Sequence, residues 1–165
     1  MPNHIAASAR ISPLAYVEES TRGSRLVIAE KAFVDAFVAI KFVGGTGDVT
    51  IGEESYLNAG TVVYSGNGVT LGKYVMVASN CTFAPTNHEF ERRDVPMIRQ
   101  RFRPSRGGIL VEDDVWIGAN CVILDGAILR RGCIVGANSV VTGELAPYSI
   151  NLGSPARFVK WRPGS

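Results

Sequence analysis

Residues 111–141 read VEDDVWIGANCVILDGAILRRGCIVGANSVV, and this stretch decides the fold of the chain. An aliphatic residue returns at every sixth position of it, at Val111, Ile117, Ile123, Leu129, Val135 and Val141. Six is a multiple of the two-residue period of a strand but not of the 3.6-residue period of a helix. Short strands separated by corners would therefore keep all these side chains pointing inward.

The same spacing returns four times upstream. The further positions are Ile5, Ile11, Val17; Ile28, Val34, Ile40; Ile51, Leu57, Val63; and Leu71, Val77, Phe83. We call all 18 positions the ladder. Three six-residue repeats make one triangular turn, so the ladder predicts an all-β solenoid of about six coils, in which stacking buries a continuous apolar column.

Small residues usually stand four positions after a ladder residue. Cys81, Cys121 and Cys133 occupy this position, which predicts that they are buried packing residues rather than nucleophiles or metal ligands. Glycine often follows the ladder residue directly, where we expect a corner with positive φ. These glycines are Gly52, Gly72, Gly118 and Gly136.

Interruptions of the ladder mark insertions. Val17 to Ile28 and Ile40 to Ile51 each span 11 residues, and Val63 to Leu71 spans eight. Phe83 to Val111 spans 28, so 22 extra residues form a loop ejected from the coil at about 84–108. We expect the ladder to end at Val141, with a C-terminal tail from about 146 in which Pro147, Gly153 and Pro155 break the strand pattern. The whole chain, 1–165, is predicted to be a single domain.

Composition excludes several classes of function. The 165 residues carry a net charge of only +2 and are 46% hydrophobic, with a mean hydropathy of +0.13, which disfavours disorder and nucleic-acid binding. No apolar run reaches the roughly 18 residues of a membrane span. The N-terminal residues show no secretory signal pattern and the three cysteines are too few for a disulfide framework, so we expect a cytoplasmic protein.

The ejected loop carries the chemistry. His88 lies near its start, where an imidazole can accept a proton near neutral pH as a general base. A solvated loop histidine without a role is the alternative. Six arginines share the loop: Arg92, Arg93, Arg99, Arg101, Arg103 and Arg106. They either recognise an anionic acceptor, such as a nucleotide-linked sugar, or pair with Glu89, Glu91 and Asp94.

The repeat pattern resembles the hexapeptide-repeat family, whose members form left-handed parallel β-helices. Residues 71–162 are similar to its sugar O-acetyltransferases, of the maltose, galactoside, nodulation and polysaccharide-modifying type. The similarity includes Thr86-Asn87-His88-Glu89, Val115-Trp116-Ile117-Gly118 and Gly153-Ser154-Pro155-Ala156-Arg157. It implies that His88 is the catalytic base and that Asn58 contacts the acceptor.

The resemblance also implies acetyl-CoA as co-substrate, without a metal. Ala119, Ala137 and Thr142 match the contacts of the pantetheine arm, and Arg157 and Lys160 match basic residues that meet the nucleotide phosphates. The family forms homotrimers with the site between subunits. The implied reaction is acetyl transfer to a sugar hydroxyl in surface polysaccharide or lipopolysaccharide biosynthesis, and the alternative is N-acetylation of a nucleotide-linked aminosugar.

Two other classes with this fold fit the sequence poorly. The carbonic anhydrase variant binds zinc through three histidines, whereas this chain has only His4 and His88. A purely structural β-helix would show regular threonine arrays and would have little reason to eject a long loop.

Overall fold

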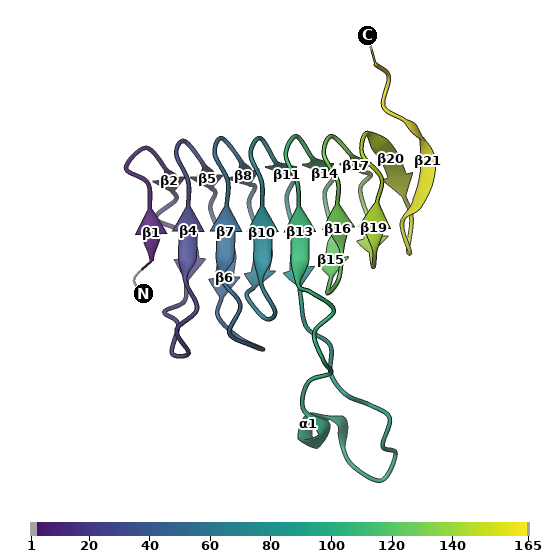
Figure 1. Ribbon diagram of the computed structural model, residues 1–165. Coiled ribbons are helices and arrows are strands. Elements are labelled where there is room, and N and C mark those ends of the chain that lie inside the picture. Colours follow the sequence, from purple (N-terminus) through teal and green to yellow (C-terminus); the bar gives the residue numbers. More distant parts are fainter. Residues whose placement is uncertain (1–2, 165) are drawn as a thin grey trace.

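The computed structural model describes residues 3–164, and it shows three sheets, parallel except for the last strand, wound into one coil (Figure 1). The first sheet contains β1 (His4–Ile5), β4 (Leu26–Ile28), β7 (Val49–Ile51), β10 (Val69–Leu71), β13 (Ile109–Val111), β16 (Ile128–Leu129) and β19 (Glu144–Leu145). The second contains β2 (Arg10–Ile11), β5 (Phe33–Val34), β8 (Tyr56–Leu57), β11 (Met76–Val77), β14 (Trp116–Ile117), β17 (Ile134–Val135), β20 (Ser149–Leu152) and β21 (Arg157–Trp161). The third contains β3 (Tyr16–Val17), β6 (Ala39–Lys41), β9 (Val62–Tyr64), β12 (Thr82–Ala84), β15 (Val122–Leu124) and β18 (Val140–Val141).

The chain visits the three sheets in turn, which confirms the predicted parallel β-helix. Register follows the ladder, because Ile28 pairs with Ile51, Ile51 with Leu71, and Leu71 with Val111. Most ladder side chains are fully buried in one core. Ile5 is 46% exposed because the first coil is covered on one side only. Met1, Pro2 and Ser165 of the predicted domain lie outside the described residues.

Coiling continues beyond Val141, so the expected end of the ladder is wrong. Leu145 of β19 pairs with Leu129, and Asn151 of β20 pairs with Val135, which starts a seventh coil. β21 then folds back antiparallel on β20. The tail forms strands despite its prolines because β17 offers a free edge to β20, and β20 then offers its own to β21.

The expectation for the corner glycines is also wrong. Positive φ occurs two residues later, at positions such as Asn80, Asn120 and Asn138. Gly118 is needed for a different reason: an added Cβ would lie 2.6 Å from the backbone nitrogen of Ala137 in the next coil. The glycine therefore permits close stacking of coils rather than an unusual backbone conformation.

All insertions leave the coil at the turn from the third sheet to the first, which we call the loop edge (residues 18–25, 42–48, 65–68 and 85–108). The segments hang from one side of the coil in Figure 1, and the longest carries the short helix α1 (Met97–Gln100). Placing them on one edge leaves the three sheets regular and gathers the irregular chain beside the ejected loop.

Candidate active site

The ejected loop is anchored by pairing between its outgoing and returning limbs. The backbone nitrogen of Glu89 donates to the carbonyl of Arg101 at 3.0 Å, and that of Arg103 donates to the carbonyl of Asn87 at 2.8 Å. His88 and Phe102 form an antiparallel bridge between these two bonds. His88 therefore stands on a short two-stranded stalk rather than on a free loop.

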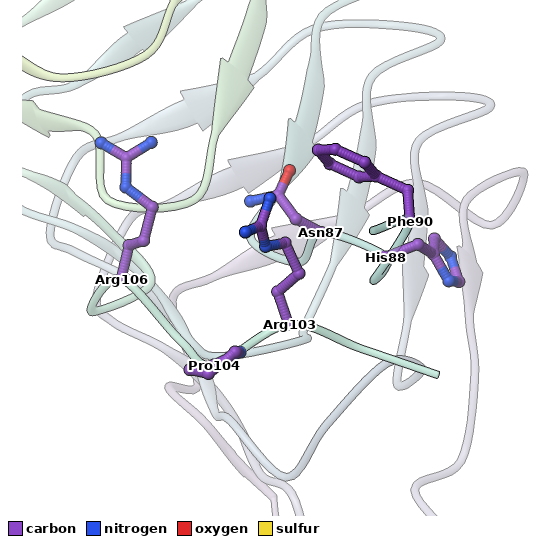
Figure 2. Close-up of a pocket in the computed structure, with 6 residues that line it drawn as sticks. All are labelled: Asn87, His88, Phe90, Arg103, Pro104 and Arg106. Atoms are coloured by element: carbon purple, nitrogen blue, oxygen red, sulfur yellow. The ribbon is translucent and has the colours of Figure 1, made fainter. Parts of the chain in front are cut away.

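The side chain of His88 is exposed and packs against the ring of Phe102, with ring centroids 4.8 Å apart and planes tilted by 35°. It borders a cavity of about 630 Å³ whose other lining residues are Asn87, Phe90, Arg103, Pro104 and Arg106. Figure 2 shows the imidazole at the opposite end of this cavity from Arg106, with the ring pointing away from that arginine. An accessible imidazole held in this way can exchange a proton with a bound hydroxyl or amine.

Two loop arginines pair with acidic residues of the same loop. The guanidinium of Arg103 lies 2.8 Å from Glu91 and 3.7 Å from Glu89, and its carbon is 4.8 Å from the centroid of Phe90. Arg92 pairs with Asp94 at 2.7 Å, and this guanidinium is the first cause of the lowered pKa of Asp94. Arg103 and Arg92 therefore form the ion pairs expected if the loop arginines pair with acidic residues of the same loop.

Arg106 is held differently. Its backbone nitrogen donates to Oδ2 of the buried Asp125 at 2.8 Å, and its Nη2 donates to the carbonyl of Thr142 at 3.2 Å. Thr142 is one of the predicted cofactor contacts, so the structure joins that position to the His88 cavity through Arg106.

Asn58 lies away from this cavity. It follows β8 at the turn from the second sheet to the third, and its Nδ2 donates to the carbonyl of Val77 at 2.9 Å. The residues lining the His88 cavity do not include Asn58, so the contact between Asn58 and the acceptor substrate stays a prediction.

Ala119 and Ala137 lie in two successive coils, at the same turn between sheets as Asn58 occupies in an earlier coil. The backbone nitrogen of Asn138 donates to the carbonyl of Ala119 at 2.9 Å, which sets the two alanines next to each other. We call this turn the alanine edge (residues 58–60, 78–80, 118–120 and 136–138). Thr142 follows β18 on the loop edge, so these predicted contacts flank the third sheet on both sides.

Arg157 and Lys160 lie on β21 at the end of the coil. They pair in register with Leu152 and Ile150 of β20, and both are exposed. Arg157 also borders a cavity of about 340 Å³ together with Ser149 and Asn151. The structure places the two basic residues on one strand, and Arg157 pairs with Leu152, whose side chain lies beside Gly136.

The three cysteines are buried, as predicted. The sulfur of Cys81 donates to the carbonyl of Gly118 at 3.2 Å, and that of Cys121 donates to the carbonyl of Gly136 at 3.1 Å. Burial raises the pKa of Cys133 to about 12, and the neighbouring Cys121 together with burial raises that of Cys81. The hydrogen bond with Cys81 lowers the pKa of Cys121, so burial, which all three sulfurs share, is what keeps them from acting as nucleophiles.

Two residues of the site escaped the sequence analysis. Phe102 carries no local signal, because its contact with His88 depends on how the limbs of the loop pair. Asp125 did carry one: it is an acidic residue between ladder positions in an apolar stretch, and its side chain is only 1% exposed. Such a carboxylate needs buried donors, which the returning limb supplies.

Comparison with protein families agrees with the repeat. Residues 108–143 match the model of the bacterial transferase hexapeptide (six repeats). Within residues 3–164, no helix is long and apolar enough to cross a membrane.

Curated relatives are acetyltransferases by name. The chain is 26% identical to galactoside O-acetyltransferase of Escherichia coli K12 over 133 residues, which are 81% of this chain and 62% of that protein. It is 28% identical over 121 residues to WbbJ of the same organism, which is named for lipopolysaccharide biosynthesis O-acetyl transfer; the match covers 70% of this chain and 62% of WbbJ. The chain spans less than two thirds of the length of the first relatives it matches.

Among solved structures, the chain resembles the D94N mutant of AntD, an N-acyltransferase from Bacillus cereus in complex with dTDP and coenzyme A. The TM-score is 0.82 at 23% identity, covering 97% of this chain and 84% of AntD. This likeness establishes the fold. The family match adds that residues 108–143 are hexapeptide transferase repeats, and the relatives are named as acyltransferases.

Proposed function

We propose that this chain of hexapeptide transferase repeats is an acetyltransferase that moves the acetyl group of acetyl-CoA to a sugar hydroxyl, with His88 as general base. The observation that carries the proposal is the exposed His88 imidazole, held on its stalk beside a cavity at the loop edge. The names of the relatives support acetyl transfer, and that of WbbJ supports a role in surface polysaccharide or lipopolysaccharide biosynthesis.

In the proposed reaction, a nitrogen of the His88 imidazole takes the proton of the acceptor hydroxyl. The acceptor oxygen attacks the thioester carbonyl, and backbone N–H groups stabilise the oxyanion that develops. Collapse of the tetrahedral intermediate forms the new ester and releases coenzyme A as its thiol, with the proton returned by the imidazolium. The buried cysteines take no part.

The remaining site residues are proposed from the family resemblance, and their positions on the coil are compatible with it. Ala119, Ala137 and Thr142 flank the third sheet, where an extended pantetheine arm would cross the stacked strands, and Arg157 and Lys160 would meet the nucleotide phosphates at the end of the coil. Asn58 would contact the acceptor from the alanine edge. Solved complexes of AntD and of VCA0836 from Vibrio cholerae contain coenzyme A or acetyl coenzyme A, which supports this donor.

The separation of the two edges supports a homotrimer. His88 belongs to the loop edge, whereas Ala137 belongs to the alanine edge, so one complete site would combine the loop edge of one subunit with the alanine edge of its neighbour. We place the enzyme in the cytoplasm, where three unpaired cysteines persist as thiols.

N-acetylation of a nucleotide-linked aminosugar is the second candidate. It is favoured by the likeness to AntD, one structure of which is a complex with dTDP-4-amino-4,6-dideoxyglucose and coenzyme A. The same base and donor would serve, because a neutral amine also loses one proton as its nitrogen forms the amide bond.

The test is the His88→Ala substitution, assayed with acetyl-CoA against a panel of hydroxyl sugars and a panel of aminosugars. Removal of a general base should lower kcat on the order of a hundredfold or more. His4→Ala, which changes the other exposed histidine in β1, is the matched control and should leave kcat unchanged. Transfer by His88→Ala within a few-fold of the parent would show that the base is assigned wrongly, and the preferred panel identifies oxygen or nitrogen as the acceptor atom.

A further inference from the structure

The cavity beside His88 has a positive end. Its lining residues include two cations, Arg103 and Arg106, and among the residues that the structure describes no carboxylate lines it. Arg103 is already neutralised by Glu89 and Glu91. Among the described residues the guanidinium of Arg106 forms no ion pair, since the carboxylate of Asp125 contacts the backbone nitrogen of this arginine instead.

The guanidinium of Arg106 has donors to spare. Its Nη2 donates to the carbonyl of Thr142, whereas a guanidinium carries five N–H groups in a planar fork. Such a fork matches the oxygens of a phosphate better than any neutral group on a sugar does. Figure 2 shows Arg106 at the far end of the cavity from His88, with Asn87 and Arg103 between them.

A buried carboxylate fixes this arginine through the backbone. Asp125 is 1% exposed, and its two oxygens accept from the backbone nitrogens of Arg106 at 2.8 Å and Gly108 at 3.0 Å. The backbone nitrogen of Gly126 donates to the carbonyl of Gly108 at 2.7 Å, which closes the clamp. The returning limb is therefore tied to the rigid coil at the residue that carries the free charge.

We propose that Arg106 binds a phosphate group in this cavity and that Asp125 is a positioning residue that holds Arg106 there. The inference deepens the proposed function and rests on it for the ligand, which is either the diphosphate of a nucleotide-linked acceptor or a phosphate of the acyl donor. The chemistry recognised is the same in both cases, an oxyanion bound by a guanidinium.

Calorimetric titration of the full chain with coenzyme A and, separately, with thymidine diphosphate tests the arginine. Arg106→Gln should weaken binding of one or both probes by about tenfold or more, and Arg106→Lys should restore part of it. Loss confined to coenzyme A assigns the donor phosphate, and loss confined to thymidine diphosphate assigns the acceptor phosphate. Unchanged binding of both probes, or no binding of either by the parent, overturns the proposal.

Arg92→Gln is the matched control, because Arg92 lies on the same loop but pairs with Asp94 and does not line the cavity. Its affinity for both probes should match that of the parent. A loss as large as that in Arg106→Gln would show that general loop charge, rather than a site at Arg106, attracts the anion.

A double-mutant cycle tests Asp125. Asp125→Asn puts an amide donor against a backbone N–H, so it should weaken the same probe, and Arg106→Gln/Asp125→Asn should bind no more weakly than Arg106→Gln alone. Additive losses would show that Asp125 supports only the fold. Asp125→Glu keeps the charge while moving both oxygens, and it replaces Asp125→Asn in the cycle if that variant does not fold.

Neither titration requires turnover. A chain that binds a probe through Arg106 but transfers no acetyl group would contradict the proposed function and leave the phosphate site standing. A chain that transfers acetyl groups with unchanged kinetics in Arg106→Gln, and binds both probes as the parent does, would contradict only the phosphate site.

Discussion

The imidazole of His88 and the ring of Phe102 pack across the two limbs of the ejected loop, with centroids 4.8 Å apart, at the bridge between the limbs. Among residues 3–164, no side chain is hydrogen-bonded to this imidazole. Its orientation is therefore set by ring packing and by the backbone hydrogen bonds between the two limbs of the loop. The proposed base is thus positioned by an aromatic contact rather than by a carboxylate.

Phe102→Ala should therefore reduce catalysis without abolishing it. An aromatic pair contributes about 0.5–1.5 kcal/mol beyond burial, which corresponds to a fall in kcat of about 2- to 10-fold as the imidazole samples other rotamers. The decrease should be well below that of His88→Ala. Steady-state kinetics with acetyl-CoA and the preferred acceptor measure both.

Ile98→Ala is the control for Phe102→Ala, because Ile98 is an apolar residue of the same loop that is 87% exposed. It should leave kcat unchanged. Equal decreases in the two variants would mean that loop hydrophobicity, and not the contact with His88, matters for the reaction.

The ladder makes a prediction about stability within a single strand, β10. Leu71 points inward and is 2% exposed, whereas its neighbour Thr70 points outward and is exposed. Leu71→Ala should lower the free energy of unfolding by about 2–5 kcal/mol through lost burial and a cavity. Thr70→Ala should change it by no more than about 0.5 kcal/mol. Urea denaturation followed by circular dichroism distinguishes them, and similar losses in both would contradict the inward-facing ladder.

The ladder could be predicted from sequence because every coil repeats the same local rule. Leu71 lies between Ile51 and Val111 although 40 residues separate it from the latter along the chain, since a strict six-residue period leaves only one register for the stack. The long loop does not change this pairing register. It leaves and re-enters the coil at the same corner, so the six-residue repeat resumes in register after it.

The site was harder to predict because it depends on contacts that no period encodes. His88 could be singled out as a histidine in an ejected loop, but its partner Phe102 follows from the pairing of the limbs. Asp125 acts on Arg106 across 19 residues of chain. Asn58 and Ala137 lie on a different edge from His88, and no period along the sequence links the two edges.

Close packing of glycines at the loop edge gives a further prediction. A Cβ added to Gly47 would collide with the backbone nitrogen of Gly68 in the next coil, and one added to Gly108 would lie 2.6 Å from the carbonyl oxygen of Gly68. Gly47→Ala should therefore cost about 1–3 kcal/mol of stability, because backbone has to move. Gly143→Ala meets nothing within 4 Å and should be neutral. Thermal unfolding of the two variants provides the comparison, and a neutral Gly47→Ala would show that the stacked insertions are loosely packed.

The buried thiols should not react with thiol reagents in the folded protein. All three thiols are buried, so at pH 8 the native protein should not react with Ellman's reagent, whereas the unfolded chain should release three equivalents. Burial also raises the pKa of Cys133 from 9.0 to about 12. Between pH 9 and 12 the unfolded state ionises Cys133 while the folded state keeps its proton. Stability should fall as pH rises through this window, by up to about 1.4 kcal/mol per pH unit. Other groups titrate there as well, so the comparison is between the parent and Cys133→Ala, whose stability should decline less steeply with pH. Parallel pH profiles, or rapid labelling of the native protein, would show that Cys133 is open to solvent and that the inner column is not closed.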